Sequence, residues 1–181
     1  MIRSFIALPV VATSEIAKVS KWLKSQGDGI RVLPPEELHL TVCFVGETPW
    51  ELTSSIGNAI EEAISGMTAI SAQLGPIGAF PNLNQPRVIW ADVTPKEPLA
   101  ELHDRLTDRL ENLGFRMEQR GYIPHVTLAR VKRELPEDFS EQLLRHSPAD
   151  LGTVQLDNVV LFESQPGRAG PDYRVLTEHY L

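Results

Sequence analysis

The sequence predicts an α+β fold made of two similar lobes. Predicted strands and helices are interspersed along the chain, and the order strand, helix, strand, helix occurs twice. A His-x-Thr motif stands in the second strand of each series, and these motifs are the only sequence identity between the halves. The 181 residues are 42% hydrophobic and 23% charged, which is typical of a globular chain of one domain.

The strands are predicted from runs of β-branched and apolar residues that end at glycine or proline. We expect strands at residues 2–8, 38–46, 68–74, 86–94, 124–132, 152–163 and 173–180. The segment GAFPN reads as a turn between the third and fourth of these strands, and residues 166–171 form a loop rich in glycine and proline.

The helices are predicted from apolar residues at helical spacing. Thr13 or Ser14 caps a first helix that continues to Leu23, and others are expected near residues 49–65 and 137–145. The clearest helix covers residues 97–113 and ends before a glycine. Its apolar stripe consists of Leu99, Leu102, Leu106, Leu110 and Leu113.

Charge and cysteine content restrict the environment and the partners of the protein. The 17 basic and 24 acidic residues give 17 − 24 = −7, which argues against a protein that coats polyanions but allows a local anion site. The single cysteine, Cys43, cannot form an internal disulfide, and the longest apolar stretch, residues 5–12, is too short to cross a membrane. We therefore expect a cytoplasmic protein, monomeric and without an obligate protein partner.

Two motifs of the pattern His-apolar-Thr-apolar are the most informative feature of the sequence. They are HLTV at residues 39–42 and HVTL at residues 125–128, and they lie 125 − 39 = 86 residues apart. Because side chains alternate along a strand, the His and Thr of each motif share one face. Continued alternation predicts that Cys43 and Ala129 follow on that face, where small side chains leave room for a ligand.

One His-x-Thr motif in a strand is usually structural, but two copies in apolar strands favour a functional site. If the strands lie side by side, both imidazoles and both hydroxyls line one cleft. Two histidines with pKa values near roughly 6.5 can supply an acid and a base together, as in-line displacement at phosphorus requires. Threonine hydroxyls can donate hydrogen bonds to the phosphate oxygens. This chemistry requires neither a metal nor a cofactor.

On these motifs the chain resembles the two-histidine phosphoesterases, and within them the LigT-like RNA 2′,3′-cyclic phosphodiesterases, also called ThpR. The resemblance covers nearly the whole chain, through the segments RSFIALPV, PPEELHLTVCFVGE, GAFPN, PRVIWADV, PHVTLARV and LFES, the last followed by Tyr173. It implies one domain over residues 1–181, with two interleaved lobes whose antiparallel sheets, flanked by helices, surround a central cleft.

The resemblance also implies an activity and roles for four residues. The terminal 2′,3′-cyclic phosphate of RNA is opened to a 2′-phosphate, with His39 as proton donor to the leaving O3′ and His125 as proton acceptor from water. Thr41 and Thr127 bind the phosphate. The residues alone do not distinguish the two histidine roles. Related activities remain alternatives, namely 2′-5′ RNA ligation and hydrolysis of small cyclic nucleotides, as does a non-catalytic module that binds RNA ends.

An acidic protein that acts on RNA needs a local excess of positive charge. Residues 116–133 contain five basic residues against one acidic residue, Glu118: Arg116, Arg120, Arg130, Lys132 and Arg133. Strict alternation points Arg130 away from the catalytic face, so a bulge or a strand end is needed to bring it to the phosphate. Arg87 is a second candidate for such a contact.

Aromatic side chains near the motifs are candidates for stacking on an RNA base. They are Phe44, Phe80, Trp90 and Tyr122. Phe44 is retained as a possible substrate contact, although Phe44 and Trp90 stand in apolar runs that favour core packing.

The other histidines show no spacing typical of a metal site. His103 is predicted on the polar side of its helix, His146 near a helix end and His179 in the last strand. Cys43 is expected to be a small core residue, and the chain lacks the glycine-rich GxxxxGK[ST] loop used to bind ATP.

Overall fold

The computed structural model describes residues 1–118, 121–168 and 170–181. Its helices are α1 (Ser14–Ser25), α2 (Thr53–Ile64), α3 (Glu97–Asn112) and α4 (Phe139–Arg145), with short 3₁₀ turns at Pro35–Glu37 and Trp50–Leu52. Its strands are β1 (Ile2–Pro9), β2 (Ile30–Val32), β3 (His39–Thr48), β4 (Ile70–Phe80), β5 (Val88–Thr94), β6 (His125–Val131), β7 (Thr153–Leu156), β8 (Asn158–Pro166) and β9 (Pro171–Tyr180).

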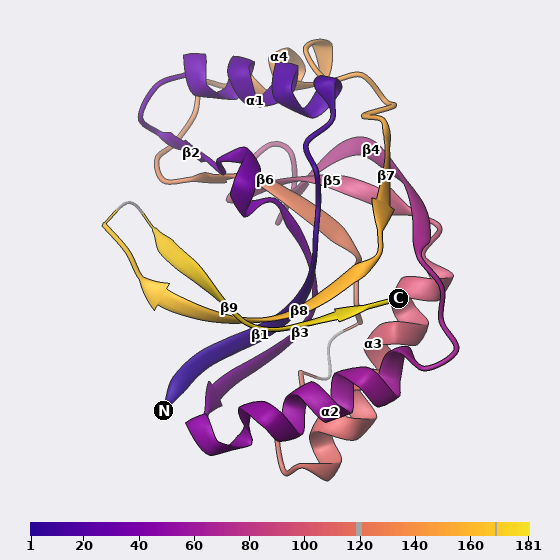
Figure 1. Cartoon of the computed structure of the whole chain (residues 1–181). Coiled ribbons are helices and arrows are strands. Elements are labelled where there is room, and N and C mark those ends of the chain that lie inside the picture. Colours follow the sequence, from indigo (N-terminus) through magenta and orange to yellow (C-terminus); the bar gives the residue numbers. More distant parts are fainter. Residues whose placement is uncertain (119–120, 169) are drawn as a thin grey trace.

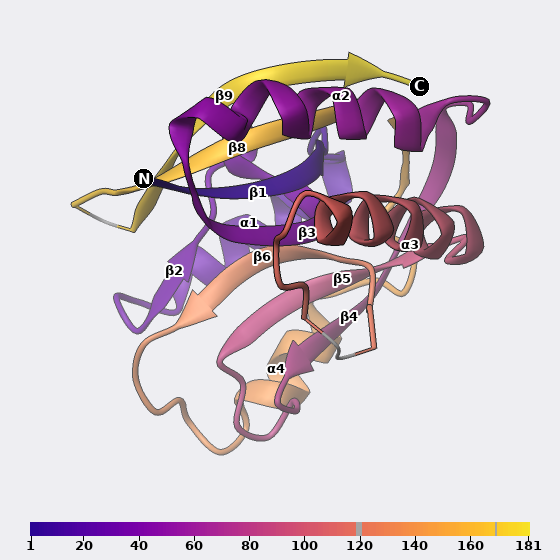
Figure 2. The ribbon, with the colours of Figure 1, turned by 90° about the horizontal axis from the view of Figure 1, so that it is seen from below.

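The strands form one curled antiparallel sheet in the order β7-β4-β5-β6-β3-β1-β8-β9, and β2 pairs with β6. Helix α1 packs against β2 and β6, whereas α2 contacts β8 and β9, and α3 contacts β3. Figure 1 shows α1 and α4 together on one side of the sheet, away from α2 and α3. In Figure 2 α2 and α3 lie next to each other, as their mutual contacts require. In this strand order, the two motif strands, β6 and β3, are neighbours at the centre of the sheet.

The two halves of the sheet repeat each other in register. In the β1–β3 ladder the first three residues of the motif are paired in step, and then Val42 is skipped. In the β5–β6 ladder the first three residues of the second motif are paired in step, and Leu128 is skipped. Each skipped residue marks a β-bulge at the fourth position of a His-x-Thr-x motif. The duplication that the order of elements predicts thus extends to the position of an irregularity.

These bulges overturn one expectation drawn from strict alternation. A bulge places two consecutive residues on the same side of the strand, so Cys43 and Ala129 turn into the core, where they are 2% and 0% exposed. The polar face continues instead with the next residue of each strand. That residue is Phe44 in β3, which is 66% exposed, and Arg130 in β6, which is also exposed.

Other differences from the sequence-based prediction have local causes. The expected strand at 152–163 is two strands, because the chain leaves β4 after β7 and crosses to β1 as β8. Strand β4 continues through the predicted GAFPN turn as far as Phe80. Gly78 makes this possible, since a Cβ there would lie 2.4 Å from the Trp90 ring that crosses it. The short strand β2 has no counterpart in the prediction.

The remaining predicted elements are present within a few residues of their expected ends. Thr13 caps α1, and its hydroxyl accepts a hydrogen bond from the Ile16 amide at 3.1 Å. In α3, four leucines of the predicted stripe are fully buried, at positions 99, 102, 106 and 110.

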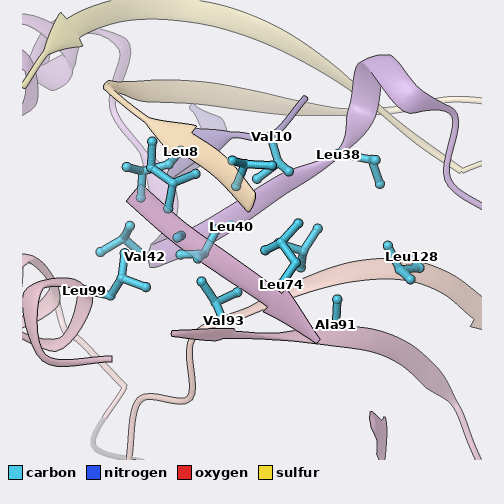
Figure 3. Packing of buried hydrophobic residues seen from close by; sticks show 14 of the residues in the cluster. Leu8, Val10, Leu38, Leu40, Val42, Leu74, Ala91, Val93, Leu99 and Leu128 are labelled. Carbon is cyan, nitrogen blue, oxygen red and sulfur yellow. The ribbon is translucent and has the colours of Figure 1, made fainter. Parts of the chain in front are cut away.

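The hydrophobic core lies on the side of the central strands opposite the two histidines. Leu40 and Val42 of β3 and Leu128 of β6 belong to the same buried cluster as Leu99 of α3 and Leu74 of β4 (Figure 3). The apolar residues of each motif thus anchor the strand whose other face carries His and Thr.

Replacing Leu40 by alanine should lower the free energy of unfolding by about 2–5 kcal/mol, because Leu40 is fully buried where β3 meets β6. Denaturant unfolding monitored by circular dichroism measures the change. Phe44→Ala, on the exposed side of the same strand, is the matched control and should change this free energy by less than about 0.5 kcal/mol. Equal losses in both variants would contradict the assigned packing.

Candidate active site

The two motifs meet at one backbone pair, Leu40 opposite Val126. In an antiparallel register this pair places His39 opposite Thr127 and Thr41 opposite His125. The two histidines are then diagonal neighbours on one face, roughly 7–8 Å apart at the backbone. The sequence predicts that these four residues share a cleft, and the geometry brings them together as a square with the imidazoles at opposite corners.

Each histidine is oriented by a carbonyl two residues earlier in the chain. The Nδ1 atom of His39 lies 2.6 Å from the carbonyl oxygen of Glu37, and the Nδ1 atom of His125 lies 2.7 Å from that of Ile123. A carbonyl oxygen only accepts hydrogen bonds, so Nδ1 carries the proton in both rings. The Nε2 atoms are left for a ligand, and each can either hold or accept a proton.

Aromatic rings surround both histidines. His39 contacts Phe5 at 5.3 Å and Tyr173 at 5.2 Å between ring centroids. His125 contacts Phe80 at 5.1 Å and Trp90 at 5.9 Å. Phe80 and Trp90, which the sequence offers as stacking candidates, flank His125, and both rings are half-buried. The packing limits the rotation of each imidazole and removes much of its hydration.

Removal of water lowers the pKa of both histidines. Burial is the largest cause for His39 and for His125, and in each case the hydrogen bond to the main-chain carbonyl partly opposes it. The positive charge of Arg130 lowers both pKa values further, and the charge of His125 also lowers that of His39. Without a ligand, the site therefore disfavours the state in which both imidazoles are protonated at once.

Arg130 lies on the face of β6 that carries His125 and Thr127, because the bulge at Leu128 reverses the alternation of side chains after Thr127. Its positive charge lowers the pKa of the Tyr173 hydroxyl, but burial has the larger effect and raises that pKa overall. Arg31 of β2 is paired directly opposite Arg130 and forms an ion pair with Glu37 at 3.4 Å. Arg31 carries no signal in the sequence, because β2 is too short to show a pattern, and Tyr173 is indicated only by the resemblance.

A hollow of about 350 Å³ adjoins His125 and Thr41. Phe44 stands at its edge and Tyr122 in its wall, together with His103 of α3. Cys43 also reaches this region, but burial raises the pKa of its thiol to about 12, so the thiolate is not formed near neutral pH. Phe44 is exposed where the sequence favoured core packing, and His103 is half-buried where the polar side of a helix was expected.

Arg87 is not brought to the histidines. It lines a different hollow of about 360 Å³, together with Arg133, between the loop after β4 and the segment before α4. Within the basic segment 116–133, Arg116 and Lys132 are exposed, and Arg120 lies outside the described residues. Arg130 is the described member of the segment whose charge acts on both histidines.

The described residues contain no group of three or more His, Cys, Asp or Glu side chains placed to hold a metal ion. Within that part of the chain, no helix is both long and apolar enough to cross a bilayer.

Comparison with known proteins identifies the family. A model of the 2′-5′ RNA ligase superfamily matches residues 12–168. The chain belongs to this superfamily. Among relatives named RNA 2′,3′-cyclic phosphodiesterase, the protein of Methanocaldococcus jannaschii is 34% identical over 97% of this chain and 99% of its own length. That of Archaeoglobus fulgidus is 32% identical over 96% of this chain and 97% of its own length.

Solved structures with similar folds cover nearly the whole of this chain. The Thermus thermophilus protein TT0787 is 26% identical and superposes with a TM-score of 0.79, covering 99% of this chain and 97% of that one. Escherichia coli LigT, in its complex with 3′-AMP, is 21% identical with a TM-score of 0.76, covering 99% and 98%. The fold is therefore LigT-like, as the resemblance implies.

Titration of the ring signals of His39 and His125 by NMR should give midpoints below pH 6.5 in the ligand-free protein, because burial lowers both pKa values from that value. Sulfate, an anion that does not titrate in this range, should raise both midpoints by favouring the imidazolium forms. His39→Gln and His125→Gln identify the signals. Ligand-free midpoints at or above pH 6.5 would contradict the assigned desolvation.

Proposed function

We propose that the protein hydrolyses the 2′,3′-cyclic phosphate at the end of RNA to a 2′-phosphate. The single observation that carries the proposal is the pair of histidines at opposite corners of one polar square, both with Nδ1 engaged and Nε2 available. Two such groups supply an acid and a base on opposite sides of one phosphorus atom. The names of the relatives from M. jannaschii and A. fulgidus support the same reaction.

The reaction begins with one histidine neutral and the other protonated. Nε2 of His125 takes a proton from water as the water oxygen attacks phosphorus in line with O3′. The P–O3′ bond breaks, and Nε2 of His39 gives its proton to O3′. The products are a 2′-phosphate and a 3′-hydroxyl, and proton exchange with solvent restores the starting state. The roles of His39 and His125 follow from the resemblance described above.

Charge that accumulates on the phosphate oxygens is stabilised by the other groups of the square. The hydroxyls of Thr41 and Thr127 donate hydrogen bonds to the non-bridging oxygens, since each threonine faces the histidine of the other motif. Arg130 adds a fixed positive charge beside His39. A bound phosphate also offsets the effect of Arg130 on the histidines, so the substrate favours the protonated state of the acid.

Phe44 provides a surface for one base of the RNA. Its ring is exposed at the edge of the hollow next to His125, in the position that Arg130 occupies in the other half of the sheet. Stacking on an aromatic ring is worth about 1–3 kcal/mol per base and tolerates any sequence. Residues 1–181 act as one catalytic unit, which works as a monomer on RNA ends.

The direct test is an oligoribonucleotide with a 2′,3′-cyclic phosphate end, followed by determination of whether the phosphate remains on O2′ or O3′. The wild-type protein should give the 2′-phosphate, and a chelator should leave the rate unchanged because histidines supply the acid and base. Binding without turnover would favour a non-catalytic module. Turnover of mononucleotides alone would favour a small cyclic nucleotide as substrate, and 2′-5′ joined products would favour ligation.

His39→Ala and His125→Ala should each lower kcat by about 10²- to 10⁴-fold. His146→Ala is the matched control, because that ring stacks on Trp22 and lies outside the cleft. Its rate should stay within about twofold of the wild type. Full activity in either cleft variant would refute the catalytic assignment.

A substrate with a good leaving group separates the two histidine roles. The 4-nitrophenyl ester of 3′-deoxyadenosine 2′-phosphate releases a nitrophenolate that needs no proton from the enzyme. His39→Ala should therefore hydrolyse this ester at a rate within about tenfold of the wild type, whereas His125→Ala should keep its full defect. The reverse pattern would exchange the assignments of acid and base.

A further inference from the structure

The bulges in β3 and β6 leave equivalent carbonyl groups that need hydrogen-bond donors. A bulge interrupts the ladder, so the carbonyl of the skipped residue turns away from its regular partner. A buried carbonyl without a donor is costly, and the native structure must supply one. β3 has a second register shift at Val45. The residues skipped within the two motifs are Val42 and Leu128, and the two halves of the sheet satisfy their carbonyls in different ways.

In the second half, a strand supplies the donor. The amide of Leu33, directly after β2, donates to the carbonyl of Leu128 at 2.9 Å. Strand β2 also pairs with the residues that follow the bulge, from Ala129 to Val131. The position of Thr127 is therefore fixed by main-chain contacts on both sides of β6.

In the first half, two side chains replace this strand. Nδ1 of His103 lies 2.8 Å from the carbonyl oxygen of Val42 and donates to it. The hydroxyl of Tyr122 donates to the carbonyl of Thr41 at 3.1 Å. The rings of His103 and Tyr122 stack with centroids 4.3 Å apart and an interplanar angle of 1°. His103 comes from α3 and Tyr122 from the segment before β6, so the pair connects three parts of the chain.

We propose that His103 and Tyr122 are positioning residues for the first motif. They hold the bulge of β3 in the place where β2 holds the bulge of β6, and they thereby set the position of the Thr41 hydroxyl at the phosphate. Neither side chain touches the reacting atoms. The inference rests on the proposed function, because it assigns the consequence of this contact to phosphate chemistry at Thr41.

Tyr122→Phe tests the inference, because it removes the donor and keeps the ring that stacks on His103. Loss of one neutral hydrogen bond should lower kcat by about 3- to 10-fold, with KM changed by less than twofold. A loss confined to KM would overturn the inference. Denaturant unfolding confirms that the variant is folded under the assay conditions.

The equivalent threonine of the second motif provides a matched control for whether Tyr122→Phe acts through Thr41. In a Thr41→Val background, Tyr122→Phe should change kcat by less than twofold, because the hydroxyl that it positions is already absent. In a Thr127→Val background, Tyr122→Phe should cause its full decrease. Equal decreases in the two backgrounds would show a general structural loss and overturn the inference.

Two variants of His103 separate its donor from its ring. His103→Asn keeps an amide donor near the position of Nδ1, whereas His103→Phe keeps only the stacked ring. Asparagine should retain at least half of the wild-type kcat, and phenylalanine should lose about 3- to 10-fold. A loss in His103→Asn with none in His103→Phe would mean that the ring, and not the hydrogen bond to Val42, matters, and would overturn the inference.

The wild-type rate tests the proposed function, whereas ratios between variants test the inference. The same cycles can be measured on the dissociation constant of adenosine 2′-phosphate, the expected type of product, by isothermal titration calorimetry. Adenosine 2′-phosphate carries more phosphate charge than the cyclic diester and so depends more on the Thr41 hydroxyl. Tyr122→Phe should then weaken its binding in the Thr127→Val background and not in the Thr41→Val background. This measurement decides the inference even if turnover of the RNA substrate is not observed.

Discussion

Antiparallel pairing of β3 with β6 at Leu40 and Val126 is the constraint on which the rest of the site depends. One pair of residues joins two half-sheets that each have their own helices, and the same pair sets the register of the two motifs. A shift by one residue would turn His and Thr of one motif into the core and Leu40 or Val126 into the cleft. The full burial of Leu40 and Val126 makes such a shift costly, so hydrophobic packing fixes the geometry of the polar square.

Packing also sets the protonation behaviour of the site. The rings that fix each imidazole exclude water, and exclusion of water lowers the pKa of His39 and His125. The lowered pKa values favour the neutral form of both imidazoles. An anionic ligand reverses this preference, because its charge favours an imidazolium next to it. Under the proposed function, the acid is thus generated mainly when a phosphate is bound, and binding is coupled to the proton transfer that follows.

The sequence predicts the four central residues because they depend on alternation and on a repeated pattern. The predicted direction of the side chain is wrong at the next position of each strand, because a bulge has no signature in short runs such as VCFV or LARV. Cys43 and Ala129 were therefore placed on the wrong face. Arg130 was predicted to reach the phosphate only through a bulge, and the bulge is present.

Residues distant in the sequence could not be predicted in the same way. Arg31 is assigned to the site only by its pairing with Arg130, and Tyr173 by its contact with His39. His103 faces β3 from a helix whose pattern shows which residues are buried but not which carbonyl a half-buried imidazole meets. These contacts arise from the packing of separate elements, which a single sequence does not encode locally.

The repeat creates two chemically equal histidines, yet acid and base must differ. The two halves differ in the residues that flank the four motif side chains, and not in those side chains themselves. Five residues after each histidine, β3 carries an exposed phenyl ring at Phe44 and β6 carries a guanidinium at Arg130. The side of the site next to His39 therefore has the positive charge of Arg130 and the ring of Tyr173, whereas the side next to His125 opens into a mostly apolar hollow. Under the proposed function, these flanking groups set the orientation in which a phosphodiester binds, because the symmetric centre gives no preference for either direction.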